Sequence, residues 1–185
     1  MSIVLIALLV VIAVVALWFI VAYNRFVKAR NMMREAWSGI EVQLKRRYDL
    51  IPNLIETVKG YMGHERALIE KVTDLRSRAM TTENIKEKGQ AENVLTQSLR
   101  SLFAVAEAYP DLKANQNFLE LQRALSDIEE QVQLSRRYYN GTVRDFNILV
   151  ESFPTNFVAG MFGFKAGDFF EISDEAQRGV PEVKF

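Results

Sequence analysis

The chain has 185 residues, of which 49% are hydrophobic and 25% charged, and its 23 basic and 23 acidic residues balance to a net charge of zero. A nucleic-acid-binding surface normally carries a basic excess, so this balance argues against nucleic acid as a partner. The chain has no cysteine and a single histidine, His64. This composition excludes disulfides and thiolate metal sites, and it removes the usual nucleophile–base pairs.

Residues 3–22 form an unbroken apolar run in which fifteen of the twenty side chains are Leu, Ile, Val or Phe. A helix of this length spans roughly 30 Å, the thickness of the hydrocarbon core of a bilayer. A cleavable signal peptide is the alternative, but the run is too long and no A-x-A pattern follows it. We therefore predict a transmembrane anchor over residues 1–24, with the lipid bilayer as its partner.

A basic cluster follows the apolar run, and it includes Arg25, Lys28 and Arg30. We expect these three side chains to lie at the membrane surface and to contact anionic headgroups. Basic flanks favour the cytoplasmic side, so the N-terminus is predicted to face outward and residues 23–185 to lie in the cytoplasm. A periplasmic or extracellular domain is the alternative, because one short flank carries the whole signal.

The remaining sequence is typical of helices, since glycine and proline are scarce and apolar residues recur every three or four positions. The anchor is expected to continue as one helix to a break at 49–52. Further helices are predicted over 50–80, over 85–108, and from Asn115 or Asn117 to Ser152, before Pro154.

The last of these helices has the clearest period, with steps of three and four that continue without error. Its seam is Phe118, Leu121, Leu125, Ile128, Val132, Ser135, Tyr139, Thr142, Phe146 and Leu149. Such a seven-residue repeat is the packing seam of a coiled coil or bundle, and short loops make neighbouring helices antiparallel. We predict an all-α fold, with an up-down four-helix bundle over 25–153 whose first helix continues the anchor.

Residues 154–185 are expected to form a short apolar helix and an extended tail. The apolar part, 156–164, is predicted either to cap the end of the bundle or to touch lipid as an amphipathic segment. The tail, 169–185, is predicted either to lie along a groove of the bundle or to be offered to a partner as an extended peptide.

Catalytic and metal-binding patterns are absent from the sequence. His64-Glu65 begins like H-E-x-x-H, but Leu68 occupies the second histidine position. The Glu-x-x-His pairs of a diiron bundle do not occur, and Glu129-Glu130 is interpreted as a solvated face. We therefore predict no catalytic residue, no metal site and no cofactor.

Two groups of polar residues are candidates for interaction. Lys45, Arg46 and Arg47 lie at the expected end of the first helix, where they either complement the helix dipole or form a docking patch for an acidic partner. A second group flanks the polar positions of the long seam and forms either an internal hydrogen-bond network or a pocket for a small ligand or peptide. Its members are Arg137, Asn140 and Asn147.

Several segments resemble the bacterial LemA family. They are QLKRRYDLIPNL at 43–54, VKGY at 58–61, YPDLKAN at 109–115, RYYN at 137–140 and VPEV at 180–183. The resemblance covers nearly the whole chain. It implies a single-pass protein of the bacterial inner membrane with a helical-bundle domain, and it also extends to proteins of the magnetosome membrane. It implies no particular biochemical activity.

These observations favour a non-enzymatic, membrane-anchored scaffold or adaptor. Its partners are expected to be a second copy of the chain, giving a homo-oligomer, or another membrane protein. The alternative is a sensing module that binds a ligand or peptide and signals to a membrane partner. An enzyme is disfavoured, because the sequence lacks the residue patterns of the usual catalytic and metal-binding sites.

Overall fold

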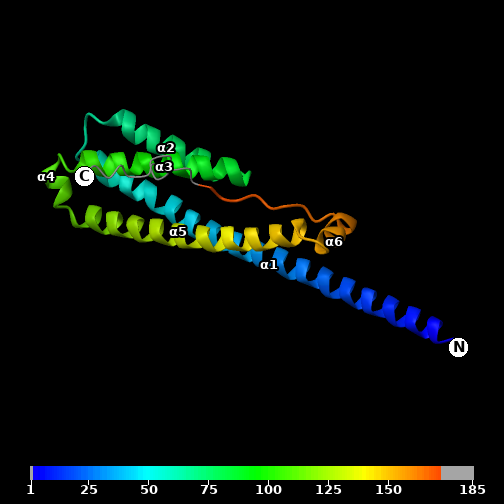
Figure 1. Ribbon diagram of the computed structural model, residues 1–185. Helices are drawn as coiled ribbons and strands as arrows, with labels where there is room; N and C mark the ends of the chain where they lie inside the picture. The colour runs from blue at the N-terminus through cyan, green and yellow to red at the C-terminus, as the bar shows by residue number, and fades with distance from the viewer. Residues whose placement is uncertain (1, 172–185) are drawn as a thin grey trace, which may run out of the picture. The chain divides into compact units, whose positions relative to one another are not determined.

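The computed structural model describes residues 2–171, and Figure 1 shows that helices dominate this part of the chain. The helices are α1 (Ile3–Lys59), α2 (Arg66–Thr81), α3 (Ile85–Ala106), α4 (Pro110–Lys113), α5 (Gln116–Glu151) and α6 (Thr155–Phe162). No strand occurs in the described residues. The predicted all-α fold with a long apolar N-terminal helix is confirmed.

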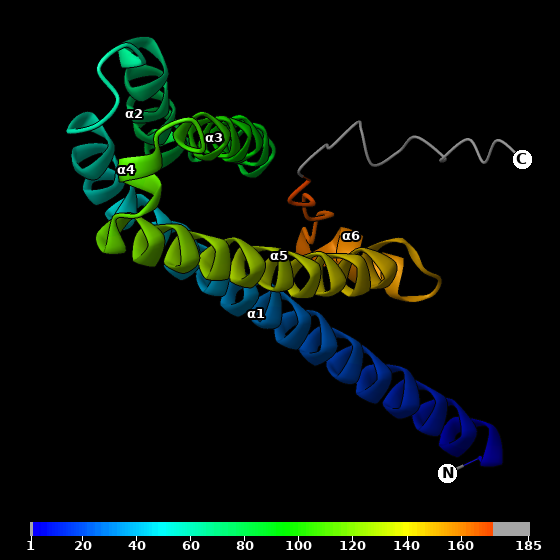
Figure 2. The ribbon, with the colours of Figure 1, turned by 90° about the vertical axis from the view of Figure 1, so that its left-hand side faces the viewer.

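The helices pack as two units. Unit 1 contains Met1–Gly39 and Arg137–Asp168, and unit 2 contains Ile40–Arg136 together with the segment that starts at Phe169. Both long helices, α1 and α5, therefore contribute residues to each unit. Within unit 2, Figures 1 and 2 show α2 and α3 side by side.

The break expected at 49–52 is wrong, because α1 continues through Pro52 to Lys59. Proline has no N–H, so a proline inside a helix leaves the carbonyl four residues earlier without its usual donor. That carbonyl belongs to Tyr48, and it accepts a hydrogen bond of 2.7 Å from Nε of Arg76 on α2. A contact from another helix thus supplies the bond that Pro52 removes.

The predicted helix over 50–80 is therefore divided between two elements. Its first ten residues belong to α1, and the rest forms α2 after a loop that contains Gly60, Gly63 and His64. The helix expected over 85–108 ends at Ala106, and Pro110 starts the short helix α4.

Local capping fixes the starts of α3 and α5. Oδ1 of Asn84 accepts from the backbone N–H groups of Lys86 and Glu87, and Oδ1 of Asn115 accepts from that of Phe118 at 3.1 Å. Such side-chain acceptors satisfy the N–H groups that the first turn of a helix leaves unpaired.

The seam predicted on α5 faces inward, as its period requires. Leu125, Ile128 and Val132 are buried in unit 2, and Tyr139 and Phe146 are buried in unit 1. The core of unit 2 also includes fully buried residues of α1 and α3, namely Ile40, Leu44, Ile51, Leu54, Leu95 and Leu102. Burial of this apolar surface is the main favourable contribution to folding.

In unit 1, the segment after α6 is extended and is held against the helices. Gly163 ends α6 in the left-handed conformation, with φ of 68°. Asn147 then binds Gly167 twice: its Nδ2 donates to the carbonyl at 3.1 Å, and its Oδ1 accepts from the N–H at 2.7 Å. Oη of Tyr139 donates to the carbonyl of Asp168 at 3.0 Å.

In unit 2, Phe170 is fully buried, and the backbone carbonyl of Glu171 occupies the space that a Cβ atom on Gly89 would need. The start of the tail therefore lies along the helices, as one of the two alternatives predicted. Most of the predicted tail, residues 172–185, lies outside the described residues.

Two glycines inside helices provide a test of this contact. A Gly→Ala change in a helix normally raises stability by about 0.5–1 kcal/mol, and we expect this gain for Gly141→Ala because a new Cβ there meets nothing within 4 Å. We expect Gly89→Ala to lower the unfolding free energy instead, since a backbone carbonyl cannot rotate away. Chemical denaturation of the full chain in mild detergent measures both. Equal gains for the two variants would contradict the packing of Glu171 on α3.

Candidate functional site

A group of polar side chains lies buried in unit 2, where α1, α3 and α5 meet. Arg47 from α1 is 3% exposed and Glu92 from α3 is 0% exposed. Thr96, one turn after Glu92, is also buried, while Glu129 from α5 is 23% exposed. Charged side chains are rarely buried unless they are paired.

Arg47 is the centre of this group. Its Nη1 lies 3.3 Å from an Oε2 atom of each of two carboxylates, those of Glu92 and Glu129. Its Nη2 donates a 2.6 Å hydrogen bond to Oγ1 of Thr96. The other oxygen of Glu92 accepts from the phenol of Tyr48, which follows Arg47 on α1.

The burial of this group changes its titration. Burial raises the pKa of the Glu92 carboxyl, while the guanidinium of Arg47 and the hydrogen bond from Tyr48 act in the opposite direction. Burial also raises the pKa of the Tyr48 phenol, and the nearby charge of Glu92 raises it further. Tyr48 therefore stays protonated and keeps its hydrogen bond to Glu92.

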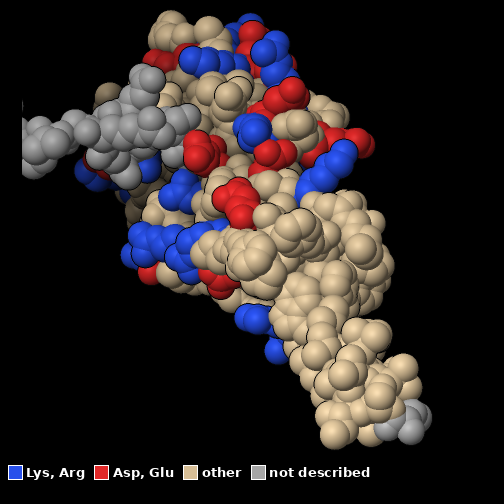
Figure 3. Space-filling view, turned by 45° about the vertical axis from the view of Figure 1, so that its right-hand side comes forward, with Lys and Arg blue, Asp and Glu red and all other residues tan. Residues whose placement is uncertain are grey.

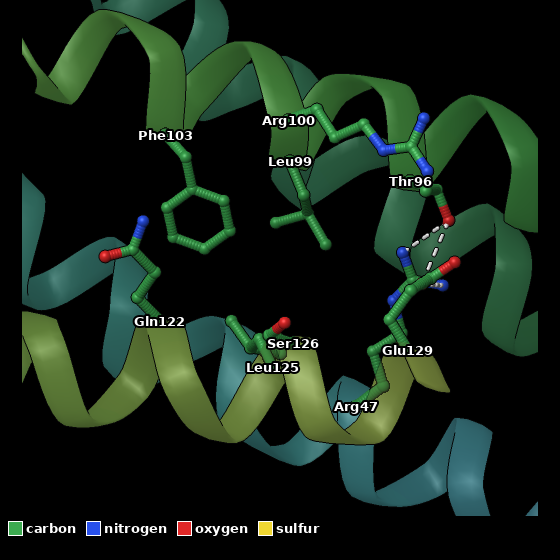
Figure 4. A pocket seen from close by; sticks show the side chains of 9 residues that line it. All are labelled: Arg47, Thr96, Leu99, Arg100, Phe103, Gln122, Leu125, Ser126 and Glu129. Atoms are coloured by element: carbon green, nitrogen blue, oxygen red, sulfur yellow. Dashed lines mark hydrogen bonds and ion pairs between the residues drawn. The ribbon is translucent and has the colours of Figure 1, made fainter. Parts of the chain in front are cut away.

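A cavity of about 300 Å³ lies beside the polar group, between α3 and α5 (Figure 4). Leu99 and Phe103 point into it from α3, opposite Leu125 of α5. The remaining lining residues are Arg47, Thr96, Arg100, Gln122, Ser126 and Glu129. An apolar cavity with a charged end suits a small amphiphilic ligand or one side chain of a peptide.

A second groove of about 450 Å³ in unit 2 lies between α1 and α5. Its lining residues are Gln43, Arg46, Asp49, Leu50, Ala124, Asp127, Ile128 and Gln131. Basic, acidic and aliphatic groups alternate here, so the groove presents a mixed surface.

The structure separates the three basic residues predicted on α1. Lys45 and Arg46 are exposed, and Nζ of Lys45 lies 3.0 Å from Oδ2 of Asp49. Arg47 is buried and paired, as described above. The interpretation that the three cations complement a helix terminus is wrong, because α1 continues to Lys59. Glu129 likewise pairs with Arg47 and does not lie on a solvated face.

The second predicted group lies in unit 1 and does not line the cavity. Arg137 is exposed and Asn140 is half-buried, whereas Asn147 holds the backbone of Gly167. On the seam, Tyr139 binds Asp168 and Thr142 donates to the carbonyl of Tyr139 at 2.7 Å. These bonds favour the predicted internal network over the predicted pocket.

Three further candidate residues lie near the end of the apolar run. Arg25 and Lys28 are exposed, but Arg30 is half-buried and its guanidinium lies 5.3 Å from the ring centroid of Phe164. This cation–π contact directs Arg30 toward the protein.

The sequence interpretation missed Glu92 and Thr96. A signal was present, because the spacing of Glu92, Leu95 and Leu99 places the carboxylate on the inward face of α3. An acidic residue at an inward position requires a buried partner. The described residues contain no group of three or more acidic or histidine side chains suited to hold a metal ion.

We predict that Arg47→Met lowers the unfolding free energy by about 3–5 kcal/mol, because it leaves a buried carboxylate without its partner. Lys45→Met is the matched control two residues away, and we expect it to cost less than about 1 kcal/mol, since its ion pair is exposed. Denaturant unfolding of the full chain in mild detergent measures both. Similar small costs would contradict the buried ion pair.

The pH dependence of the Arg47→Met cost identifies the group left unpaired. Loss of Arg47 removes an interaction that lowers the pKa of Glu92 and leaves the burial that raises it. When folding raises the pKa of a carboxyl, the folded state binds the proton more tightly than the unfolded state does. The unfolding free energy therefore rises as the pH falls. The cost of Arg47→Met should therefore shrink as the pH is lowered. A cost independent of pH would show that Glu92 is not the unpaired group.

The chain was compared with known proteins. Protein LemA of Metamycoplasma hominis is 27% identical over 156 residues, which are 82% of this chain and 69% of that protein. Magnetosome protein MamQ 2 of Paramagnetospirillum magneticum is 22% identical over 175 residues, and magnetosome protein MamQ of Magnetospirillum gryphiswaldense is 21% identical over 174 residues. Each of these two matches covers 80% of this chain, and the chain spans 64% of the length of each magnetosome protein.

The sequence model of the LemA family matches residues 36–185. The match includes Arg47, Glu92 and Glu129 and confirms the resemblance seen in the sequence. The chain therefore belongs to the LemA family, which has bacterial members.

Proposed function

We propose that this LemA-family protein is a single-pass protein of the bacterial inner membrane whose helical domain acts in the cytoplasm as a non-enzymatic scaffold or adaptor. The observation that carries the proposal is the N-terminal part of α1. Among the described residues, α1 is the one helix long and apolar enough to span a membrane, and its most apolar window has no buried residue.

The exposed apolar surface of α1 favours lipid over water. Ile3 to Leu17 are all exposed, and Figure 3 shows no Lys, Arg, Asp or Glu on the visible face of the apolar end. The fifteen Leu, Ile, Val and Phe residues contribute about 0.3–0.6 kcal/mol each, so insertion gains on the order of 5–9 kcal/mol. Arg25 and Lys28, which are exposed after the run, support a cytoplasmic domain.

The scaffold role is supported by the state of the buried polar groups. Arg47, Glu92, Tyr48 and Thr96 hydrogen-bond to one another, as expected of a network that positions helices. The exposed groove beside Arg46 offers a mixed polar and aliphatic surface for a protein. Confinement to a bilayer raises the effective concentration of a partner, so a weak contact suffices. That partner is a second copy of the chain or another membrane protein.

The cavity between α3 and α5 favours a second candidate function. Its volume, its apolar sides and its charged end support a sensing module that binds a small ligand or peptide and signals to a membrane partner.

We predict that the full chain stays in membranes washed at alkaline pH and that deletion of residues 2–22 releases it. Because the chain has no cysteine, Ser2→Cys supplies a unique thiol, which an impermeant maleimide should label on intact bacteria. Ser101→Cys, on an exposed position of α3, should react only after the cells are disrupted. Release of the full chain by the wash would contradict anchoring, and the reversed labelling pattern would contradict the orientation alone.

The scaffold and sensor functions predict different results in native membranes. A photo-crosslinking residue at Arg46 should give one discrete protein adduct, whether or not small molecules have been washed out. The matched control is Lys71, an exposed cation on α2, which should give none. Equal crosslinking at both positions would contradict a specific scaffold surface.

A sensor should instead gain thermal stability from a small-molecule or peptide fraction. Ser126→Phe, at the exposed rim of the cavity, should abolish that gain. Stabilisation that survives this change would rule out the cavity as the binding site.

A further inference from the structure

Helix α6 and Phe153, in the turn that precedes it, expose a stripe of large apolar side chains. Phe153 is 79% exposed, Phe157 63% and Met161 67%, and these residues are spaced by four. Phe162 is 51% exposed beside them. The whole segment 153–164 contains no charged residue. Exposed apolar groups gathered in this way mark a contact surface.

The opposite face of α6 fixes the helix to α1 within unit 1. Val158 and Ala159 are buried in a cluster with Ala22, Phe26 and Phe146, and Phe164 completes it. Phe162 also contacts Tyr23, with ring centroids 4.8 Å apart.

These contacts define the level of α6 along α1. The apolar run ends at Ala22, and the exposed cations Arg25 and Lys28 follow within about 9 Å at a rise of about 1.5 Å per residue. In a helix that spans a bilayer, this transition marks the boundary between acyl chains and headgroups. Aromatic residues such as Tyr23 are enriched at that boundary.

We propose that α6 is an interfacial helix, with Phe153, Phe157 and Met161 inserted among the lipids of the same bilayer that α1 spans. This inference rests on the proposed anchoring of α1. The exposed cations Arg25 and Lys28 lie on either side of Phe26 in the sequence, and Lys165 directly follows Phe164, so all three adjoin residues of the cluster that holds α6. They match the anionic headgroups of a bacterial membrane. Glu151, at the exposed end of α5, precedes the stripe and stays in water.

The bilayer is favoured over a protein as the occupant for two reasons. First, the stripe carries no charge or hydrogen-bonding side chain that would position a protein partner, whereas lipid requires none. Second, an apolar face at this level of α1 adjoins the acyl chains without any further association step. An interfacial helix of this kind would give unit 1 a second contact with the membrane and limit its rotation about α1.

Site-directed spin labelling of the full chain tests the proposal, because the chain has no cysteine of its own. Three single-cysteine variants are reconstituted in vesicles of phosphatidylcholine and phosphatidylglycerol: Val11→Cys, Phe157→Cys and Tyr138→Cys. Each of these residues is exposed, so the label does not disturb the core. Collision rates with oxygen report lipid exposure, and those with a water-soluble nickel chelate report water exposure.

We expect the ratio of oxygen to nickel accessibility to be several-fold higher at Phe157 than at Tyr138, which lies on α5 in the same unit. Val11 reports the anchor independently. A lipid signal at Val11 with a water signal at Phe157 would overturn the interfacial helix and leave the anchoring intact. A water signal at Val11 would overturn the anchoring itself.

A protein occupant gives a distinct result. In that case the Phe157 label would be exposed to water in pure lipid vesicles and would become inaccessible to both reagents only in native membranes. That outcome would also overturn the lipid contact.

Discussion

The guanidinium of Arg47 joins three helices of unit 2 at one buried point. It is almost completely buried, and its partners come from two other helices, Glu92 and Thr96 from α3 and Glu129 from α5. A shift of any of these helices by one turn along its axis would leave a buried charge unpaired, at a cost of several kcal/mol. Apolar residues of the same volume often give equal or greater stability than a buried ion pair. We therefore interpret the main role of the buried ion pair as fixing the alignment of the three helices, with little net gain in stability.

The neighbouring residue, Tyr48, links this alignment to the continuity of α1. Its phenol donates to Glu92, and its backbone carbonyl accepts from Arg76 because Pro52 provides no N–H. One residue thus connects α1 to α3 through its side chain and to α2 through its backbone. The proline would be unfavourable in an isolated helix, but here it frees an acceptor that holds another helix in place.

Structural features that depend on residues close together in the sequence could be predicted. Features that depend on a contact with a residue on another helix could not. The three-and-four spacing of α5 identified its buried face and left Asn115 or Asn117 as its cap, because both features depend on residues within a few turns. In the structure the cap is Asn115. The continuation of α1 through Pro52 was not predicted, since the compensating donor, Arg76, lies on another helix. Glu92 was missed for a related reason: its spacing shows that it faces inward but does not show that Arg47 lies opposite.

The exposure of the α6 stripe is built into unit 1, because the chain is restrained on both sides of the helix. At the start of α6, Oγ1 of Thr155 donates to the carbonyl of Leu149 at 2.7 Å. After it, Phe164 stacks on Phe26 with ring centroids 4.7 Å apart, and Asn147 holds Gly167 through two hydrogen bonds. Rotation of α6 to bury Phe157 would break these contacts and would expose Val158. The fold therefore keeps the stripe on the outside, as a permanent apolar surface at the level where the run on α1 ends.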